Sequence, residues 1–260
     1  MYYFFWKIHP ILCSNFFDLQ ISWYSCWVFL GWVLSFLYFD NISKSLTRLK
    51  ADYYKIVFFI FFFLGSRLGF YIEVILWGDP SKLQFVAVQE GGFSGQVGGI
   101  IAIIVISIIH LIQANDKLPL LLLLDYIAIA GLPSIVCTRI GNFFNHESLG
   151  IPTTRLIGVI FSHATSSKNN IPLHPVQLYE AAGYLLGYSL VLFLNRKDSP
   201  KGEFFSKICL IISLIRFVLE YLKEDIENGF PSPGQCFSLP FLLAGILLTF
   251  RNRRKKVSIN

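Results

Sequence analysis

Residues 137–150 read Cys137-Thr-Arg139-Ile-Gly-Asn142-Phe-Phe-Asn145-His146-Glu147-Ser-Leu-Gly150, and they follow an apolar run long enough to cross a lipid bilayer. Arg139, Asn142 and His146 repeat at steps of three and four, so a helix puts them on one face. A helix end that reaches the membrane interface and caps itself is the simpler explanation. Ionisable groups inside a membrane favour a functional site instead. A fixed cation beside neutral hydrogen-bonding groups suits an anionic headgroup attached to apolar tails.

The composition places the whole chain in a membrane. Hydrophobic residues make up 54% of it and charged residues 15%, against roughly 25% charged in soluble domains. The net charge of +6 does not indicate a nucleic-acid partner, because the cations lie between apolar runs and therefore report topology. The five cysteines are scattered without a pairing motif, which favours small buried side chains over a disulfide framework or a zinc site.

Seven apolar runs predict an all-α integral membrane protein, with residues 1–260 forming a single polytopic membrane domain. Each run approaches or exceeds the ~20 residues that a helix needs to cross about 30 Å of hydrocarbon. The predicted spans are 17–39, 56–77, 93–113, 118–138, 175–195, 203–222 and 234–250.

Lysine and arginine placement predicts the orientation of these spans. Fourteen of these residues fall in the linkers after spans one, three and five, near the start of span six, or in the tail. The N-terminus and the other linkers hold five: Lys7, Lys82, Arg155, Lys168 and Lys223. The positive-inside rule then puts the N-terminus outside and the basic tail, 251–260, in the cytoplasm, where it contacts anionic lipid. The long outer segment 139–174 predicts a small outer cap.

Three arginines lie within or at the edge of predicted spans: Arg67, Arg139 and Arg216. Each costs roughly 2.5–3.5 kcal/mol or more at a helix centre. The predicted topology lets all three line one outward-leaning cavity. Glu180, one turn inside the fifth span, is expected to pair with one of them. An ion pair between Arg216 and Glu220, four residues apart, is the alternative for Arg216.

Other polar groups collect near the same membrane face. Gly65-Ser-Arg67-Leu-Gly69 indicates helix packing through its glycines, with Tyr71 or Glu73 as a partner for the arginine. Trp23-Tyr24 is typical of an aromatic belt. The glycine-rich run 90–99 predicts either an anion-binding loop or a flexible turn with close helix packing.

These motifs together resemble the bacterial prolipoprotein diacylglyceryl transferase family, in order and over nearly the whole chain. The most specific part of the match is Arg139-Ile-Gly-Asn142-Phe-Phe-Asn145 followed by His174-Pro-Val-Gln177-Leu-Tyr-Glu180. The other matching motifs are Trp23-Tyr24, Gly65-Ser-Arg67-Leu-Gly69, Gly91-Gly92-Phe-Ser94, Glu147-Ser-Leu-Gly150, Arg216 with Glu220, and Gly234-Gln235-Cys-Phe-Ser238-Leu-Pro240.

The resemblance implies a reaction in the bacterial cytoplasmic (inner) membrane. Phosphatidylglycerol donates its diacylglyceryl group to the lipobox cysteine of a prolipoprotein, a thioether forms and glycerol phosphate leaves. The substrate's thiolate is the nucleophile, and no metal or organic cofactor is implied. Arg139 and Arg216 match the catalytic arginines, whose guanidinium forks suit phosphate. The implied substrate-binding residues are Tyr24, Gln96, Asn142, Asn145, Gly150, His174 and Gln177, and the supporting residues are Arg67, Glu147, Glu180 and Glu220.

The sequence departs from the family at two positions. Gln96 stands where the family usually has histidine, and Ile212 where it often has tyrosine. A glutamine cannot act as a general base, so His174, His146 or water takes the thiol proton, or the enzyme is slow. A lipid-binding paralogue of the same fold without turnover is the alternative function. A transporter is disfavoured, because the chain has no repeated halves.

Overall fold

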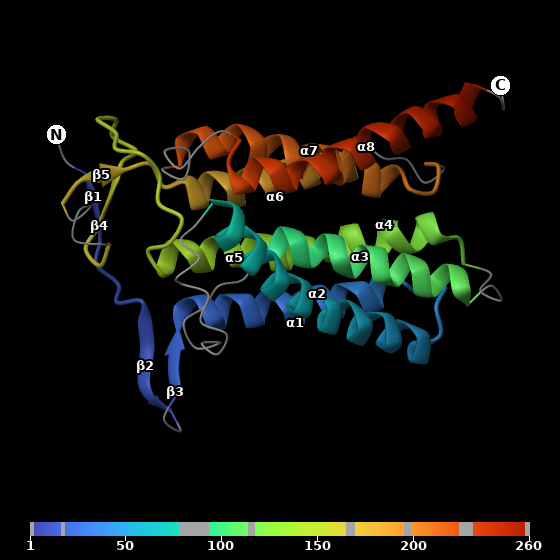
Figure 1. Ribbon diagram of the computed structural model, residues 1–260, viewed down its shortest axis with the longest axis horizontal. Coiled ribbons are helices and arrows are strands. Elements are labelled where there is room, and N and C mark those ends of the chain that lie inside the picture. Colours follow the sequence, from blue (N-terminus) through green and yellow to red (C-terminus); the bar gives the residue numbers. More distant parts are fainter. Residues whose placement is uncertain are drawn as a thin grey trace.

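The computed structural model describes residues 3–16, 19–77, 94–113, 118–164, 170–194, 199–223 and 231–257. Most of these residues lie in helices that run side by side along the long axis of the molecule (Figure 1). The helices are α1 Trp23–Ile42, α2 Arg48–Trp77, α3 Gly95–Ile112, α4 Leu120–Ala130, α5 Leu132–Phe144, α6 Val176–Leu194, α7 Glu203–Leu219 and α8 Pro233–Val257, with a short 3₁₀ helix, η3 Glu220–Leu222.

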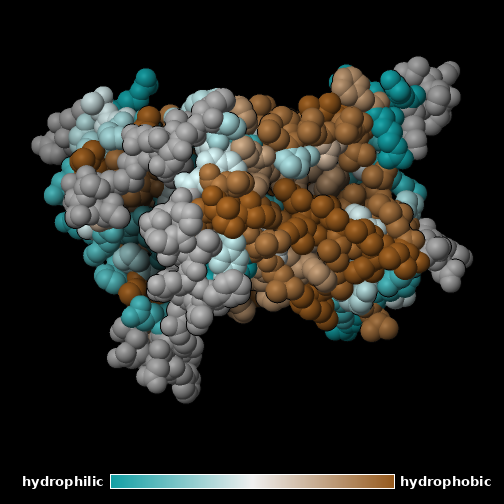
Figure 2. Space-filling view, in the orientation of Figure 1, coloured by the Kyte–Doolittle hydropathy of each residue, from teal (hydrophilic) through white to brown (hydrophobic). Residues whose placement is uncertain are grey.

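Five membrane-spanning candidates are present among the described residues by length and apolar composition: α1, α2, α3, the α4–α5 pair and α8. On the face shown in Figure 2, apolar side chains form a broad band over the middle of the bundle, with hydrophilic residues towards its two ends. The mostly helical fold with several candidate membrane spans is therefore confirmed, although the described residues also contain five short strands. For α6 and α7, which lie alongside the other helices (Figure 1), the crossing stays a prediction, as does the orientation of the bundle.

Several helix boundaries differ from the predicted spans, each for a local reason. The first helix starts at Trp23 rather than at 17, because Leu19–Ser22 is a strand and the Ser22 hydroxyl caps the helix by accepting from the Ser25 N–H at 3.1 Å. The single span predicted at 118–138 is two helices, which meet at Gly131 just before Pro133. Proline fits the first turn of the second helix because that position needs no amide donor.

The predicted tail, 251–260, is not separate from the last span. Helix α8 continues through it to Val257, with Pro240 inside its first half. Residues 258–260 of the tail and residues 90–93 of the glycine-rich run lie outside the described residues.

The predicted outer cap contains a small sheet at one end of the bundle. Strands β4 Val159–Phe161 and β5 Pro172–Leu173 are antiparallel, and β1 Phe4–Trp6 adds to β4 in parallel (Figure 1). A separate hairpin, β2 Ile11–Phe16 with β3 Leu19–Ser22, leads into α1. Phe143, Phe161 and Leu173 form the buried core of the cap, so the cap is packed directly onto the end of α5.

Close helix contacts depend on small residues and one buried carboxylate. A Cβ on Gly65 or Gly69 would overlap Ile101 or Val97 of α3, which confirms the predicted packing of α2 through its glycines. Asp125 of α4 is 4% exposed and accepts the N–H groups of Gly202 at 2.7 Å and Phe205 at 2.8 Å. This carboxylate therefore caps the start of α7 from a neighbouring helix.

Candidate active site

A buried carboxylate, Glu180, joins three helix ends near the cap. It lies one turn into α6 and is fully buried. Its Oε1 accepts from Arg216 Nη1 at 2.5 Å and from Lys223 Nζ at 3.0 Å, and its Oε2 lies 3.2 Å from Arg139 Nε. The prediction that Glu180 pairs with an arginine is confirmed; it pairs with two of them and with a lysine.

Glu220 extends the same cluster. Its Oε2 lies 3.4 Å from both Arg216 Nε and Lys223 Nζ, and its Oε1 accepts from the Ser232 hydroxyl at 3.1 Å. The predicted pair between Arg216 and Glu220 is therefore present in addition to the pair with Glu180. Gly234, in the first turn of α8, lies so close to this carboxylate that a Cβ there would overlap it.

The ion cluster, defined as Arg139, Glu180, Arg216, Glu220 and Lys223, carries excess positive charge. Three cations and two carboxylates give 3 − 2 = +1. The two carboxylate side chains are 0% and 2% exposed, whereas those of Arg139 and Arg216 are 19% and 14% exposed. The accessible part of the cluster therefore belongs to the two arginine side chains, which favours an anion as the group that contacts it.

A second polar group continues from Arg139. Arg139 Nη1 donates to Asn142 Oδ1 at 3.5 Å, and the Glu147 carboxylate accepts from Asn142 at 3.2 Å and from Asn145 at 2.5 Å. Gln177 Nε2 donates to the Glu147 backbone carbonyl at 2.5 Å. These amides, expected to orient a headgroup, hold the loop after α5 in place in this structure.

The loop after α5 passes through a narrow gap at Gly150. The Gly150 N–H donates to the His174 carbonyl at 3.2 Å, and the next N–H, from Ile151, donates to the Leu222 carbonyl at 2.9 Å. A Cβ on Gly150 would overlap the His174 carbonyl oxygen. Glycine at this position thus lets the loop bind the start of α6 and the end of η3 together.

Tyr24 and Gln96 lie at the edges of this site. The first turn of α1 places Tyr24 against Gly141, where an added Cβ would be 3.2 Å from the tyrosine ring. Gln96 Nε2 donates to the Gly234 carbonyl at 3.4 Å and so joins α3 to the start of α8 beside Glu220. Arg67 lies over the rings of Phe70 and Tyr71 on its own helix, with its guanidinium carbon 5.4 and 5.2 Å from the ring centres.

His146 is not on the face of Arg139 and Asn142, contrary to the sequence prediction. Helix α5 ends at Phe144, and His146 has a φ of +55°, which turns its side chain away from the helix. Its Nε2 lies 2.9 Å from the Ile8 carbonyl, and its ring packs against Phe161 in the cap. The residue therefore ties the N-terminal segment to the loop.

Both candidate histidine bases are neutral near pH 7. Burial lowers the pKa of His146. The hydrogen bond to the Ile8 carbonyl acts in the opposite direction, and the nearby His163 and His9 lower the pKa further. Burial followed by Arg155 lowers the pKa of His174. The His174 Nδ1 lies 3.2 Å from the Tyr179 hydroxyl.

Lys223 is the site residue that the sequence analysis missed. Its place in a linker predicts an outer-face cation, yet its side chain is 1% exposed and contacts both buried carboxylates. Burial, and next the charge of Arg216, lower its pKa to about 8. Its spacing carried a signal, because Glu220 and Lys223 stand three apart on one helical turn.

We expect Lys223→Met to weaken both the fold and anion binding, since it removes a charged donor from two buried carboxylates and lowers the cluster charge to zero. Loss of hydrogen bonds to a charged group costs about 1.5–3 kcal/mol. Thermal unfolding and titration with inorganic phosphate measure the two effects. Lys223→Arg should retain more of both properties. Lys7→Ala is the exposed control, and an equal effect there would contradict the assignment.

Comparison with known proteins gives a consistent family. The family model described as prolipoprotein diacylglyceryl transferase matches residues 10–251. The chain is 30% identical to a phosphatidylglycerol–prolipoprotein diacylglyceryl transferase of Tolumonas auensis, over 97% of this chain and 98% of the relative. Proteins of the same name from Wolbachia pipientis and Chlamydia pneumoniae are 31% and 29% identical, over 92% and 94% of this chain and 95% and 91% of their own.

Proposed function

Since the chain belongs to the prolipoprotein diacylglyceryl transferase family, we propose that it transfers the diacylglyceryl group of phosphatidylglycerol to a prolipoprotein and that the ion cluster holds the phosphate. The acceptor is the thiol of the lipobox cysteine. The chain thus acts in lipoprotein biosynthesis as a multi-pass membrane transferase.

The bond changes define what the site has to stabilise. The cysteine sulfur attacks the glycerol carbon that carries the phosphate ester, a C–S bond forms, and the C–O bond to phosphate breaks. Glycerol phosphate leaves with the electron pair, and the thiol loses its proton to a base or to water. Negative charge accumulates on the leaving phosphate, so fixed cations beside it lower the barrier.

The observation that carries the proposal is the positive, partly accessible arginine face of the ion cluster. The contacts within the described residues use Nε and Nη1 of Arg139 and of Arg216. The Nη2 amino group of each arginine is therefore the donor we assign to phosphate oxygens. Glu180 fixes the two guanidinium groups at one place, and preorganised donors need not reorient during the reaction.

The remaining site residues have positioning roles in this proposal. Asn142, Asn145 and Gln177 hold the Glu147 loop beside Arg139, and Gly150 fixes the far end of that loop. Tyr24 packs against Gly141 and so forms the side of the site that α1 contributes.

The orientation follows from charge. The cap lies at one end of the bundle, and the C-terminal end of α8 lies at the other (Figure 1). The ion cluster belongs to the cap end, because the loop of the cap binds the start of α6 and the end of η3. With the basic end in the bacterial cytoplasm, the ion cluster faces the side to which prolipoproteins are exported.

A transferase-depleted bacterium tests the function. Expression of this chain at a normal level should restore diacylglyceryl modification, seen as a mobility shift of a lipoprotein precursor. The lipid-binding alternative rests on Gln96 and on Ile212, which packs in the apolar cluster around Tyr184 and Tyr188. Binding of phosphatidylglycerol by the purified chain without modification in the cell would select that alternative.

We expect Gln96→His to retain or raise transfer activity, because an imidazole beside Glu220 can accept a proton whereas an amide cannot. Any gain should fade below about pH 6, where the imidazole becomes protonated. Rates measured between pH 5.5 and 8 test this expectation. Gln96→Asn is the matched amide control. Complete loss in Gln96→His with activity retained in Gln96→Asn would mean that Gln96 has a different role.

A further inference from the structure

A cavity lies between α7 and α8 at the end of the bundle opposite to the ion cluster. It has a volume of about 200 Å³ and is lined by Glu203, Ser206, Lys207, Thr249, Asn252 and Arg253. The two helices touch closely at Gly245, where a Cβ would be 2.8 Å from the Ser206 carbonyl. Beyond this contact α8 diverges from the bundle (Figure 1), and the cavity lies between the separating helix ends.

Two buried donors in this cavity have no hydrogen-bond partner among the described residues. Asn252 is 5% exposed, and its Nδ2 amino group is unpaired; the Thr249 hydroxyl is buried and unpaired as well. A buried polar group without a partner costs roughly 1–3 kcal/mol. An external acceptor in the cavity would remove this cost.

The charges of the cavity indicate what kind of acceptor fits. Lys207 pairs with Glu203 at 2.7 Å, so that pair adds no net charge. Arg253 is exposed, has no ion pair among the described residues, and gives the lining a net charge of +1. The residues that line this cavity carry amide, hydroxyl, ammonium and guanidinium donors, which match the oxygens of a phosphate ester.

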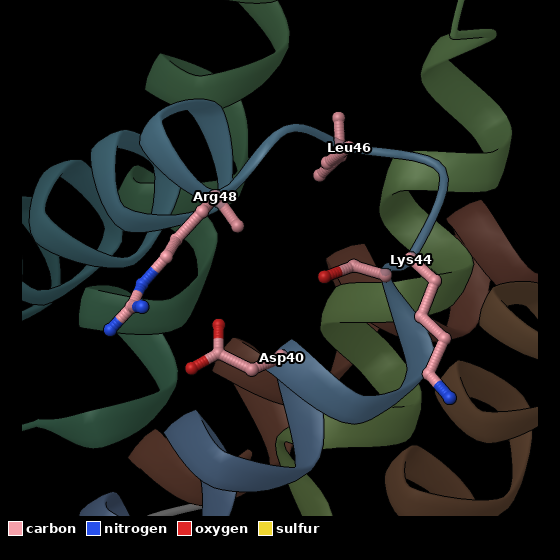
Figure 3. Close-up of a pocket in the computed structure, with 6 residues that line it drawn as sticks. Asp40, Lys44, Leu46 and Arg48 are labelled. Carbon is pink, nitrogen blue, oxygen red and sulfur yellow. The ribbon is translucent and has the colours of Figure 1, made fainter.

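A second cavity at this end of the bundle differs in its polar donors and in the direction of its cations. It has a volume of about 320 Å³ and lies where α1 turns into α2. The Lys44 and Arg48 side chains leave it in different directions, while the Asp40 carboxylate is on its wall (Figure 3). Asp40 is bound by Lys55 at 2.7 Å, and no buried unpaired donor lines this cavity among the described residues.

We propose that the α7–α8 cavity binds the phosphate of an acidic phospholipid from the membrane leaflet at the basic end of the bundle. The lipid phosphate accepts from Asn252, Thr249 and Arg253, and its acyl chains lie along the apolar belt beside α8. Leu243, Leu247 and Phe250 of α8 are exposed large apolar residues that suit such chains. The site is distinct from the ion cluster and does not rest on the proposed function.

Thermal unfolding of the purified full-length chain tests the site. The chain is compared in detergent micelles that contain phosphatidylcholine as the only lipid and in the same micelles with added phosphatidic acid. We expect phosphatidic acid to raise the Tm of the wild type. Arg253→Gln should weaken the titrated lipid affinity by about tenfold, as expected for one lost charge-assisted hydrogen bond. Arg254→Gln is the control, because it removes the same charge from the next position, outside the cavity lining. An equal effect of the two changes would overturn the proposal in favour of general surface attraction.

Asn252→Leu separates a binding role from a purely structural one. If the cavity binds a lipid phosphate, this variant should lose most of the rise in Tm that phosphatidic acid causes. If the cavity binds no phosphate, the change only removes an unsatisfied amide and raises Tm equally in both kinds of micelle, which would overturn the proposal. Inorganic phosphate in phosphatidylcholine micelles forms the third arm. Full stabilisation by inorganic phosphate alone would assign the cavity to a free anion and overturn the lipid.

Discussion

An Arg216→Ala variant is expected to lose at least 10²–10³-fold in transfer rate, the range typical for removal of one donor to a developing negative charge. Arg216 donates to Glu180 at 2.5 Å and lies beside Glu220, and it contributes to the accessible positive face of the ion cluster. Arg139→Ala should cause a loss of similar size. Initial rates with phosphatidylglycerol and a lipobox peptide measure both.

Lysine should not fully replace either arginine, because an ammonium cannot hold Glu180 and a phosphate with one planar fork. Arg251→Ala is the matched control: Arg251 is an exposed arginine towards the end of α8, outside the ion cluster. Normal rates for Arg139→Ala and Arg216→Ala, equal to the rate of this control, would remove the phosphate-holding role.

Glu180→Gln is expected to destabilise the fold more than any surface change. The substitution keeps the shape but leaves Arg139, Arg216 and Lys223 with Glu220 as the one remaining carboxylate of the cluster. Removing one partner of a buried ion pair costs about 3–5 kcal/mol. The thermal unfolding midpoint in lipid should therefore fall well below that of the wild type.

The matched control is Asp52→Asn. Asp52 pairs with Lys55 at 2.8 Å, but its side chain is 46% exposed, and exposed pairs contribute about 0–1 kcal/mol. If Glu180→Gln unfolds at the same temperature as Asp52→Asn, the ion cluster is not a structural centre.

The sequence predicted those features that depend on neighbouring residues or on the free-energy cost of burying a charged group. Apolar runs placed the helices, and the cost of a buried carboxylate predicted that Glu180 has a cationic partner. The glycines of α2 predicted close helix packing, and the structure identifies α3 as the partner. In each case the residue type alone restricts the environment: apolar residues face lipid or the core, a buried carboxylate needs a cation, and glycine allows close helix contact.

The missed features depend on the three-dimensional arrangement. The divided fourth span needs the joint effect of Gly131 and Pro133. The position of His146 follows from a left-handed turn after α5, which spacing alone does not reveal. The position of Lys223 in a linker predicts an exposed cation. Its burial depends on the fold, which brings the end of η3 next to Glu180.

The parallel pairing of β1 with β4 has a consequence for biogenesis. Phe4–Trp6 is synthesised more than 150 residues before its partner Val159–Phe161, so the N-terminal segment has to wait while five helices emerge from the ribosome. Contacts of such large sequence separation form late. Phe4–Trp6 therefore joins this sheet late, and a bulky group inserted directly before β1 would impede maturation even though every helix inserts normally.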